Sequence, residues 1–174
     1  MIVGALGALG CRDLDRFDTK PGEAYCGSLI GAGFTHEGFI PKGTRPRRVD
    51  MRLELDTDNL STFPGTLSTN VPQDGLCGTE PIFNGSKLRA IEAMFHDPLS
   101  FIEFGEGRDH NFFAWVDSVC LQTTLLAVVS LMKNDDVEVR LLKPKPEAPP
   151  DAPEVDKAGF GVFLLNRQAG SCGF

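Results

Sequence analysis

The sequence predicts a mainly β protein: an antiparallel β-sandwich or barrel-like domain with one short helix at about residues 86–96. Apolar and charged residues alternate over residues 49–56, which is the pattern of a half-buried strand. Further β-prone stretches recur along the chain with turn signals between them. The length of 174 residues fits a single domain, which can bury roughly 70% of the surface of its unfolded chain.

The elements that follow the alternating strand are predicted from turn and spacing signals. Residues 62–69 are β-prone but are interrupted by a Pro-Gly pair, which favours an edge strand or a bulge. An Asn-Gly pair at 84–85 is a two-residue turn signal. Leu88 and Ile91 have helical spacing, so residues 86–96 are predicted to form the one short helix.

The second half of the chain predicts further strands and one long loop. The β-prone runs lie at residues 99–104, 112–119, 123–132, 137–141 and 159–166. The polar residues 133–136 separate two of these runs, which predicts a hairpin. A membrane crossing by residues 112–132 is the alternative, but Asp117 and Gln122 inside this run favour a buried hairpin. Residues 143–157 contain five prolines and four acidic residues and predict an extended surface loop between two paired strands.

The N-terminal residues predict export. Residues 1–10 are apolar or small, Cys11 follows, and the chain then turns polar. The segment Ala8-Leu9-Gly10-Cys11 resembles the lipobox of bacterial lipoproteins, in which the cysteine is lipidated and becomes the new N-terminus. The resemblance implies that residues 1–10 are the remnant of a signal whose true start lies upstream of Met1. The alternative is that they form a first strand or a buried tail.

This resemblance also implies a compartment and a domain organisation. We expect a polar tether over residues 11–24 and a single β-rich domain over residues 25–174. We also expect a bacterial protein that is exported, periplasmic or associated with the outer membrane, and held there by its lipid anchor. No transmembrane helix is predicted in the mature chain.

The other cysteines predict disulfide bonds. Four of them are widely spread, and none forms a C-x-x-C pair: Cys26, Cys77, Cys120 and Cys172. An even number of such cysteines suits two disulfides in an oxidising compartment. The alternative is four buried free thiols in a cytosolic protein. The sequence leaves all three connectivities open.

The net charge of −7 argues against nucleic acid as a partner, because phosphate binding needs a surplus of Lys and Arg. One basic segment departs from this balance, and it comprises Lys42, Arg45, Arg47, Arg48 and Arg52. It is interpreted as a solvated loop leading into a strand, or as a patch that contacts an anionic polymer or an acidic partner.

Polar groups that could carry chemistry are densest between residues 96 and 110. They are His96, Asp97, Glu103, Glu106, Arg108, Asp109 and His110. No H-E-x-x-H motif and no G-x-S-x-G motif is present in the sequence. We therefore predict no metal site, no cofactor and no catalytic residue. A metal-assisted envelope hydrolase that uses the His96/His110 region is the rival hypothesis.

These observations predict a non-catalytic binding or structural subunit of the cell envelope, with another envelope protein as its partner. A glycan-binding β-sandwich is a further alternative. It ranks lower because one Trp and one Tyr offer little surface on which sugars can stack.

Overall fold

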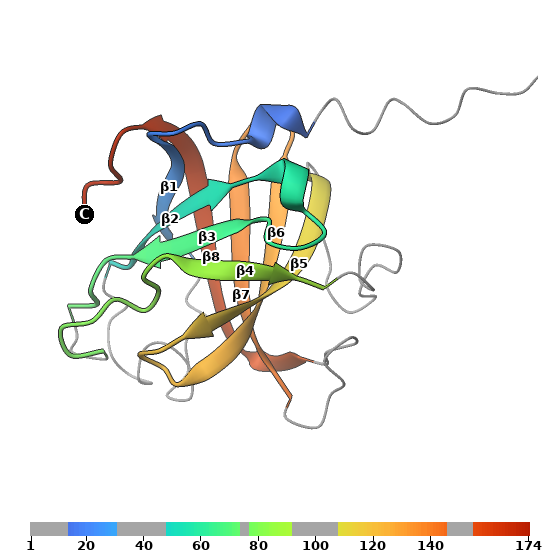
Figure 1. Ribbon diagram of the computed structural model, residues 1–174. Helices are drawn as coiled ribbons and strands as arrows, with labels where there is room; N and C mark the ends of the chain where they lie inside the picture. Colours follow the sequence, from blue (N-terminus) through green and yellow to red (C-terminus); the bar gives the residue numbers. More distant parts are fainter. Residues whose placement is uncertain (1–13, 31–47, 74–76, 92–107, 146–154) are drawn as a thin grey trace, which may run out of the picture.

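A computed structural model describes residues 14–30, 48–73, 77–91, 108–145 and 155–174 of the chain. Eight antiparallel strands in these residues close into a barrel (Figure 1). Each strand pairs with the next one along the chain, and the last pairs with the first. The prediction of a mainly β, barrel-like domain is confirmed, and the sandwich option is wrong because the sheet closes on itself.

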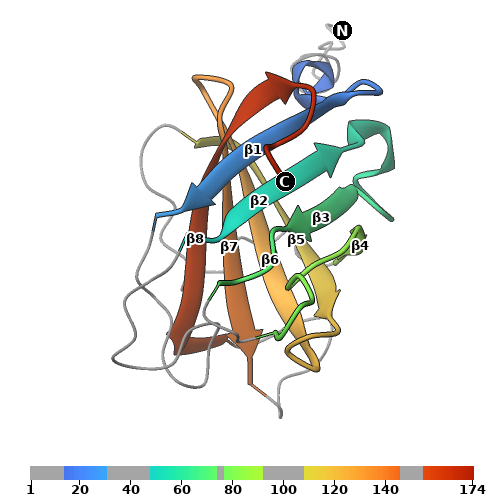
Figure 2. The same cartoon turned by 90° about the vertical axis from the view of Figure 1, so that its left-hand side faces the viewer.

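The strands follow one another in sequence order around the barrel (Figure 2). They are β1 (Glu23–Leu29), β2 (Asp50–Leu55), β3 (Gly65–Thr69), β4 (Ser86–Ala90), β5 (Arg108–Ser118), β6 (Thr123–Met132), β7 (Val137–Pro144) and β8 (Val155–Ala169). The helical elements among the described residues are two short 3-10 turns, η1 (Asp15–Phe17) and η2 (Thr57–Asn59).

Side-chain alternation sets which face of each strand lines the barrel interior. In β2, Met51, Leu53 and Leu55 are buried in the core. Arg52 and Glu54 alternate with them on the outside and pair with each other, with 2.7 Å between Nη2 and Oε1. Because side chains of a strand point alternately to its two faces, the pattern read from the sequence fixes this strand and its orientation.

The seam where the barrel closes depends on a glycine. Gly27 of β1 lies opposite Leu165 of β8. A Cβ atom added at Gly27 would lie 1.9 Å from the carbonyl oxygen of Leu164, which is far closer than any real contact. A side chain at this position would force the two strands apart, so Gly27 permits the close approach of the two backbones.

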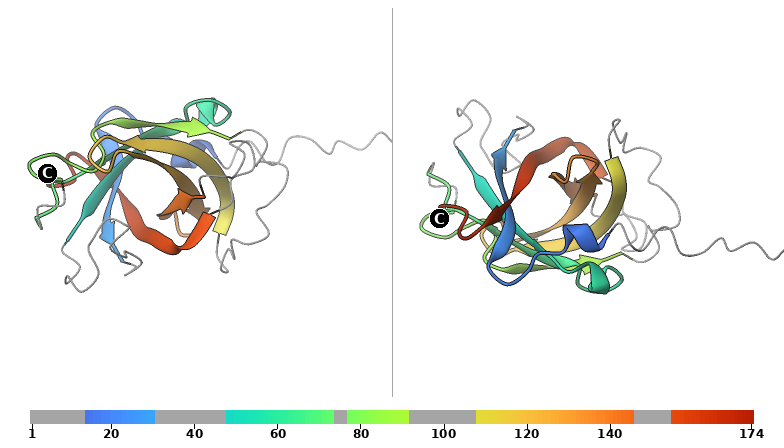
Figure 3. Two further views of the ribbon diagram at one scale, coloured as in Figure 1. Left: turned by 90° about the horizontal axis from the view of Figure 1, so that it is seen from below. Right: turned by 90° about the horizontal axis from the view of Figure 1, so that it is seen from above.

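The two ends of the barrel differ, and each is named here by its elements. The η1 end carries η1, η2 and the turn between β6 and β7, and Figure 3 looks along the barrel from both ends. The far end is the opposite one, where β1, β3, β5 and β7 finish. At the η1 end the Phe17 side chain is completely buried in the core.

The described part of the predicted tether, from Leu14 onward, packs against the barrel. Leu14 is half-buried against the core, and the Asp18 carboxylate accepts hydrogen bonds from the backbone N–H and the hydroxyl of Thr57. Arg167 of β8 donates hydrogen bonds to the carbonyl oxygens of Arg16 and Asp18. Residues 14–24 therefore belong to the folded domain.

The predicted helix at 86–96 is wrong over residues 86–90, which form β4, while residues 92–96 lie outside the described part of the chain. Leu88 points into the barrel core. Ile91 instead joins a second apolar cluster, with Phe113 and Leu126, on the outside of the barrel. The helical spacing of Leu88 and Ile91 therefore arises because they bury on opposite faces of the sheet.

Most other predicted strands are confirmed with shifted ends. The third strand begins at Gly65, after Pro64, because proline cannot donate a ladder hydrogen bond. The hairpin of β6 and β7 is present as predicted, and β7 and β8 pair with each other across the proline-rich loop. The strands extend to Pro144 and from Val155, so that loop is shorter than 143–157. Residues 99–104 and 146–154 lie outside the described residues.

Two disulfides form, and the alternative of four free thiols is wrong. Cys26 of β1 bonds Cys172 in the C-terminal segment, and Cys77 bonds Cys120 in the turn between β5 and β6. The Cα atoms of each pair are 5.4 Å apart, as in ordinary disulfides. Across the described ranges, the structure contains no helix long and apolar enough to cross a bilayer.

Candidate functional site

The inner face of the barrel is packed as a core. Its buried side chains come from all eight strands and include Met51, Leu53, Val129, Leu141 and Phe163. None of the buried members of this cluster is more than 5% exposed. Eight-stranded barrels have an interior that side chains can just fill, or that holds one small ligand. Here the described inner face is filled.

The Tyr25 hydroxyl is an unusual polar atom in this core. The residue is fully buried, and its hydroxyl has no hydrogen-bond partner among the described residues. The guanidinium carbon of Arg167 lies 5.7 Å from the centre of the Tyr25 ring. Burial raises the pKa of Tyr25 to about 12, because the phenolate would lose its hydration inside the barrel.

The ionisation of Tyr25 can be followed directly, since it is the only tyrosine in the chain. We expect tyrosinate absorbance of the folded protein to titrate with a midpoint near 12, against 10.0 for an unperturbed phenol. Between these values the unfolded state has lost a proton that the folded state keeps. Stability from this group is therefore complete below pH 10 and is lost as the pH rises toward 12.

Tyr25→Phe is the matched control for this titration. The variant should lose the absorbance change and show a shallower fall in stability over the same pH window. It should be no less stable at pH 7, because a buried hydroxyl without a partner costs about 1–3 kcal/mol. A folded-state midpoint near 10 would contradict the proposed burial of the hydroxyl.

The η1 end carries a polar hollow of about 760 Å³. It is lined by Asp15, Arg16, Asp18, Thr19, Lys20, Pro21, Glu23, Leu55, Asp56 and Arg167. Arg167 donates to Glu23 at 3.0 Å as well as to the two carbonyls described above. The backbone N–H of Lys20 and then Arg167 lower the pKa of Glu23. These groups bind one another and join the N-terminal segment to β8. We therefore interpret the hollow as a structural feature that holds the two ends of the chain together.

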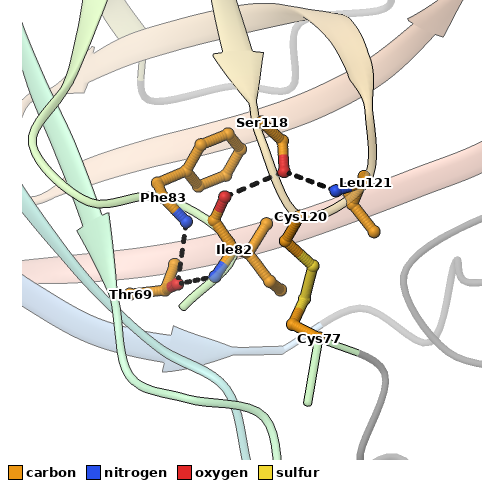
Figure 4. Close-up of a disulfide and its surroundings, with 7 residues drawn as sticks. All are labelled: Thr69, Cys77, Ile82, Phe83, Ser118, Cys120 and Leu121. Carbon is orange, nitrogen blue, oxygen red and sulfur yellow. Dashed lines mark hydrogen bonds between the residues drawn. A yellow bond between two sulfur atoms is a disulfide. The ribbon is translucent and has the colours of Figure 1, made fainter. Parts of the chain in front are cut away.

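The far end contains a compact network around the second disulfide (Figure 4). The Thr69 hydroxyl oxygen accepts hydrogen bonds from the backbone N–H groups of Ile82 and Phe83, at 3.0 and 3.2 Å. The Ser118 hydroxyl donates to the Ile82 carbonyl at 2.8 Å and accepts from the Leu121 N–H at 3.2 Å. Thr69 at the end of β3 and Ser118 at the end of β5 thereby bind the segment that precedes β4.

Exposed large apolar side chains also occur at the far end. Ile30, which follows β1, is 61% exposed, and Val119, which follows β5, is 88% exposed. Val71, just after β3, is exposed as well. Three of the five exposed large apolar side chains in the described residues thus lie at this end, and exposed apolar surface is a common feature of protein interaction sites. The far end is therefore the best candidate for a binding site among the described residues.

Part of the outer face of β5, β6 and β7 is buried too, and it includes a polar row. Ser130 lies opposite Asn111 on one neighbouring strand and opposite Glu138 on the other. Ser130 Oγ and Asn111 Oδ1 are buried, and neither has a hydrogen-bond partner in the described part of the chain. Glu138 pairs with Arg140 at 2.6 Å. The row lies beside the outer apolar cluster of Phe113 and Leu126.

The predicted basic patch is described only at two positions. Arg48 pairs with Asp50 at 2.8 Å, and Arg52 pairs with Glu54. Both described arginines thus have carboxylate partners, which fits solvated strand positions. The remaining members, Lys42, Arg45 and Arg47, lie outside the described residues.

Few side chains of the His96/His110 region are described. His96 lies outside the described residues, and so does Cys11. His110 lies in β5, opposite Leu131, but its side chain is not described. No group of three His, Cys, Asp or Glu side chains that could hold a metal ion occurs in the described ranges.

Sequence reasoning missed the residues that organise both ends of the barrel. Ser118 and Ile82 are 36 residues apart, and Arg167 and Asp18 are 149 residues apart. No local pattern marks such partners. The only sequence signal for the far-end network was its cysteines, because Cys77 lies close to Ile82 in the sequence and Cys120 lies close to Ser118.

The fold and its ends define a class: a closed, up-and-down, eight-stranded antiparallel barrel with two disulfides, whose interior is packed over the described side chains. No family model, no curated protein and no solved structure matches the chain.

Proposed function

We propose that this chain is an exported, lipid-anchored protein of a bacterial cell envelope whose barrel is a non-catalytic binding module. The observation that carries the binding role is the contrast between a filled interior and exposed apolar side chains at the far end. A rigid scaffold that presents its loops at one end commonly binds through them.

Two features support export and anchoring. Two disulfides are typical of proteins that fold in an oxidising compartment. The lipobox-like segment ends at Cys11, three residues before Leu14, which packs at the η1 end. Three residues span roughly 10 Å at most, so a lipid on Cys11 would hold the η1 end close to the membrane. The far end would then face away, toward another envelope protein.

The anchor is tested in the native host with the complete upstream signal. We expect Cys11→Ser to move the protein from the membrane fraction to the soluble fraction, and to abolish metabolic labelling with a radioactive fatty acid. The folded domain should keep its melting temperature, because Cys11 precedes the residues that pack. Equal labelling of the parent and the variant would reject the lipid anchor.

The same strains test the binding end. A photoreactive amino acid at position 119, at the far end, should cross-link a defined envelope protein. The same group at position 63 is the control, because Phe63 is also exposed but lies beside β3 at the η1 end. Cross-links from position 63 alone would place the contact at the other end and overturn the proposed binding surface.

A second candidate function is the binding of a small apolar ligand inside the barrel. Closed eight-stranded antiparallel barrels include the lipocalins, which hold one such ligand, and the interior of this barrel is apolar. Architecture alone does not define function. The described interior is packed, so an internal ligand would have to displace side chains such as Met51 and Phe163. Stoichiometric binding of an apolar dye by the folded protein would favour this candidate.

The glycan-binding alternative gains no support from the single Tyr and the single Trp. Tyr25 is buried, and Trp115 packs against the outer apolar cluster. Neither ring is free to form a platform for a sugar.

A further inference from the structure

We infer that the Cys77–Cys120 disulfide is a removable clamp at the far end, whose reduction by a dithiol loosens the surrounding turns while the barrel stays folded. This inference concerns the far end itself and does not depend on whether Cys11 is lipidated.

Access to the sulfur atoms differs between the two disulfides. Cys77 and Cys120 are both half-buried, and the residues beside them, Gly78 and Val119, are exposed. In the other disulfide, Cys26 is only 4% exposed, while its partner Cys172 is half-buried. A thiolate must reach a sulfur atom to start exchange. Both cysteines of the clamp at the far end are thus half-buried, whereas one of the two in the Cys26–Cys172 bond is buried, so the clamp is the more accessible disulfide.

The structure around the clamp is held by other bonds as well. Thr69 holds the N–H groups of Ile82 and Phe83, and Ser118 binds the carbonyl of Ile82 (Figure 4). Ile82 and Phe83 are 2% and 1% exposed and belong to the barrel core. These contacts lie between the clamp and the strands, so they can keep β3, β4 and β5 in place when the disulfide opens.

The turn that carries Cys120 is short and has an unfavourable backbone conformation. It spans residues 119–122 between β5 and β6 and is closed by a hydrogen bond from the Gln122 N–H to the Val119 carbonyl at 3.2 Å. Gln122 has a φ of 50°, in the left-handed region that residues other than glycine rarely adopt. Opening the clamp would allow this turn to relax and would change the surface around Val119.

The chemistry is ordinary thiol–disulfide exchange with a dithiol as the reductant. Its thiolate attacks one sulfur of the pair, the S–S bond breaks, and a mixed disulfide forms. The second thiol of the reductant then displaces the remaining protein sulfur. Cys77 and Cys120 end as two thiols, and the dithiol ends as a disulfide, so two electrons and two protons pass to the protein.

The test uses the full chain, dithiothreitol as the dithiol, and native buffer. After alkylation of free thiols, mass spectrometry of peptides identifies which cysteines were reduced. We expect Cys77 and Cys120 to be alkylated at dithiol concentrations that leave the far-ultraviolet circular dichroism unchanged. Amide hydrogen exchange should rise in peptides that cover 77–80 and 119–122 and stay unchanged in β6, β7 and β8.

Two variants make the result decisive. Cys77→Ala/Cys120→Ala imitates the open clamp and should show the native dichroism and the exchange pattern of the reduced parent. Thr69→Val removes the acceptor for two buried N–H groups, so reduction of this variant should also expose the peptide that contains Ile82. Alkylation of Cys77 and Cys120 only in step with a global loss of protection would overturn the inference, as would a double variant that does not fold.

Discussion

Phe17→Ala is expected to lower the free energy of unfolding by about 3–5 kcal/mol, the usual cost of removing a fully buried phenylalanine ring. The ring is completely buried in the barrel core. Its backbone N–H also donates to the Leu14 carbonyl at 2.8 Å, so the residue closes a turn as well as filling space. Urea unfolding followed by the fluorescence of the single tryptophan gives the measurement.

Phe63→Ala is the matched control, because Phe63 is 52% exposed and lies at the same end of the barrel. Its described aromatic contact is Lys87, whose ammonium lies 5.5 Å from the ring centre. We expect a loss within about 1 kcal/mol. Equal effects of the two substitutions would show that residues 14–17 act as a loose tether, as the sequence had suggested.

Leu14 and Phe17 pack on the core ahead of residue 25, where the sequence predicted the start of the domain. Residues 12–18 are mostly charged, and Leu14 and Phe17 are the two apolar residues among them. Two apolar residues are too few to establish a periodicity, so nothing in the sequence distinguishes a core residue here from an exposed one. The burial of Phe17 depends on strands far along the chain, and it is secured by Arg167, which lies 151 residues from Arg16.

Strands with a complete local pattern were predictable. Residues 49–56 alternate strictly, and β2 follows them closely. The hairpin of β6 and β7 was predictable because two apolar runs flank a short polar turn, in which Asp135 adopts a φ of 65°. The strand β4 was missed because it is only five residues long and presents one buried side chain, Leu88, which is too few for a period of two to be recognised.

The candidate site was predictable only in its cysteines. Their even number indicated two disulfides, but their pairing depends on how the barrel closes. Nothing in the sequence marks the hydroxyl side chains of Thr69 and Ser118, and only the closed sheet brings them to the same connection. For the basic segment, the sequence left open a solvated loop or a patch for an anionic partner. Where the segment is described, Arg48 and Arg52 pair with carboxylates two residues away.

Loss of the Cys26–Cys172 disulfide is expected to be among the most destabilising changes in the molecule. The two cysteines are 146 residues apart, so the bond restrains almost the whole unfolded chain. The chain-entropy model assigns roughly 5 kcal/mol to a loop of this length and roughly 4 kcal/mol to the Cys77–Cys120 loop, whose ends are 43 residues apart. We therefore expect Cys26→Ala/Cys172→Ala to lower the melting temperature by roughly 10–20 °C.

The pair Cys77→Ala/Cys120→Ala is the matched control, with the smaller expected loss. The test depends on which double variant loses more stability rather than on the size of either loss, because strain in the folded state alters the contribution of each disulfide separately. The Cys26–Cys172 bond also joins β1, at the seam that closes the barrel, to the C-terminal segment after β8. Removing it should therefore raise hydrogen exchange along β1 and β8 first. A larger loss of stability from the Cys77–Cys120 pair would mean that this bond supports the barrel itself, and would count against its role as a removable clamp.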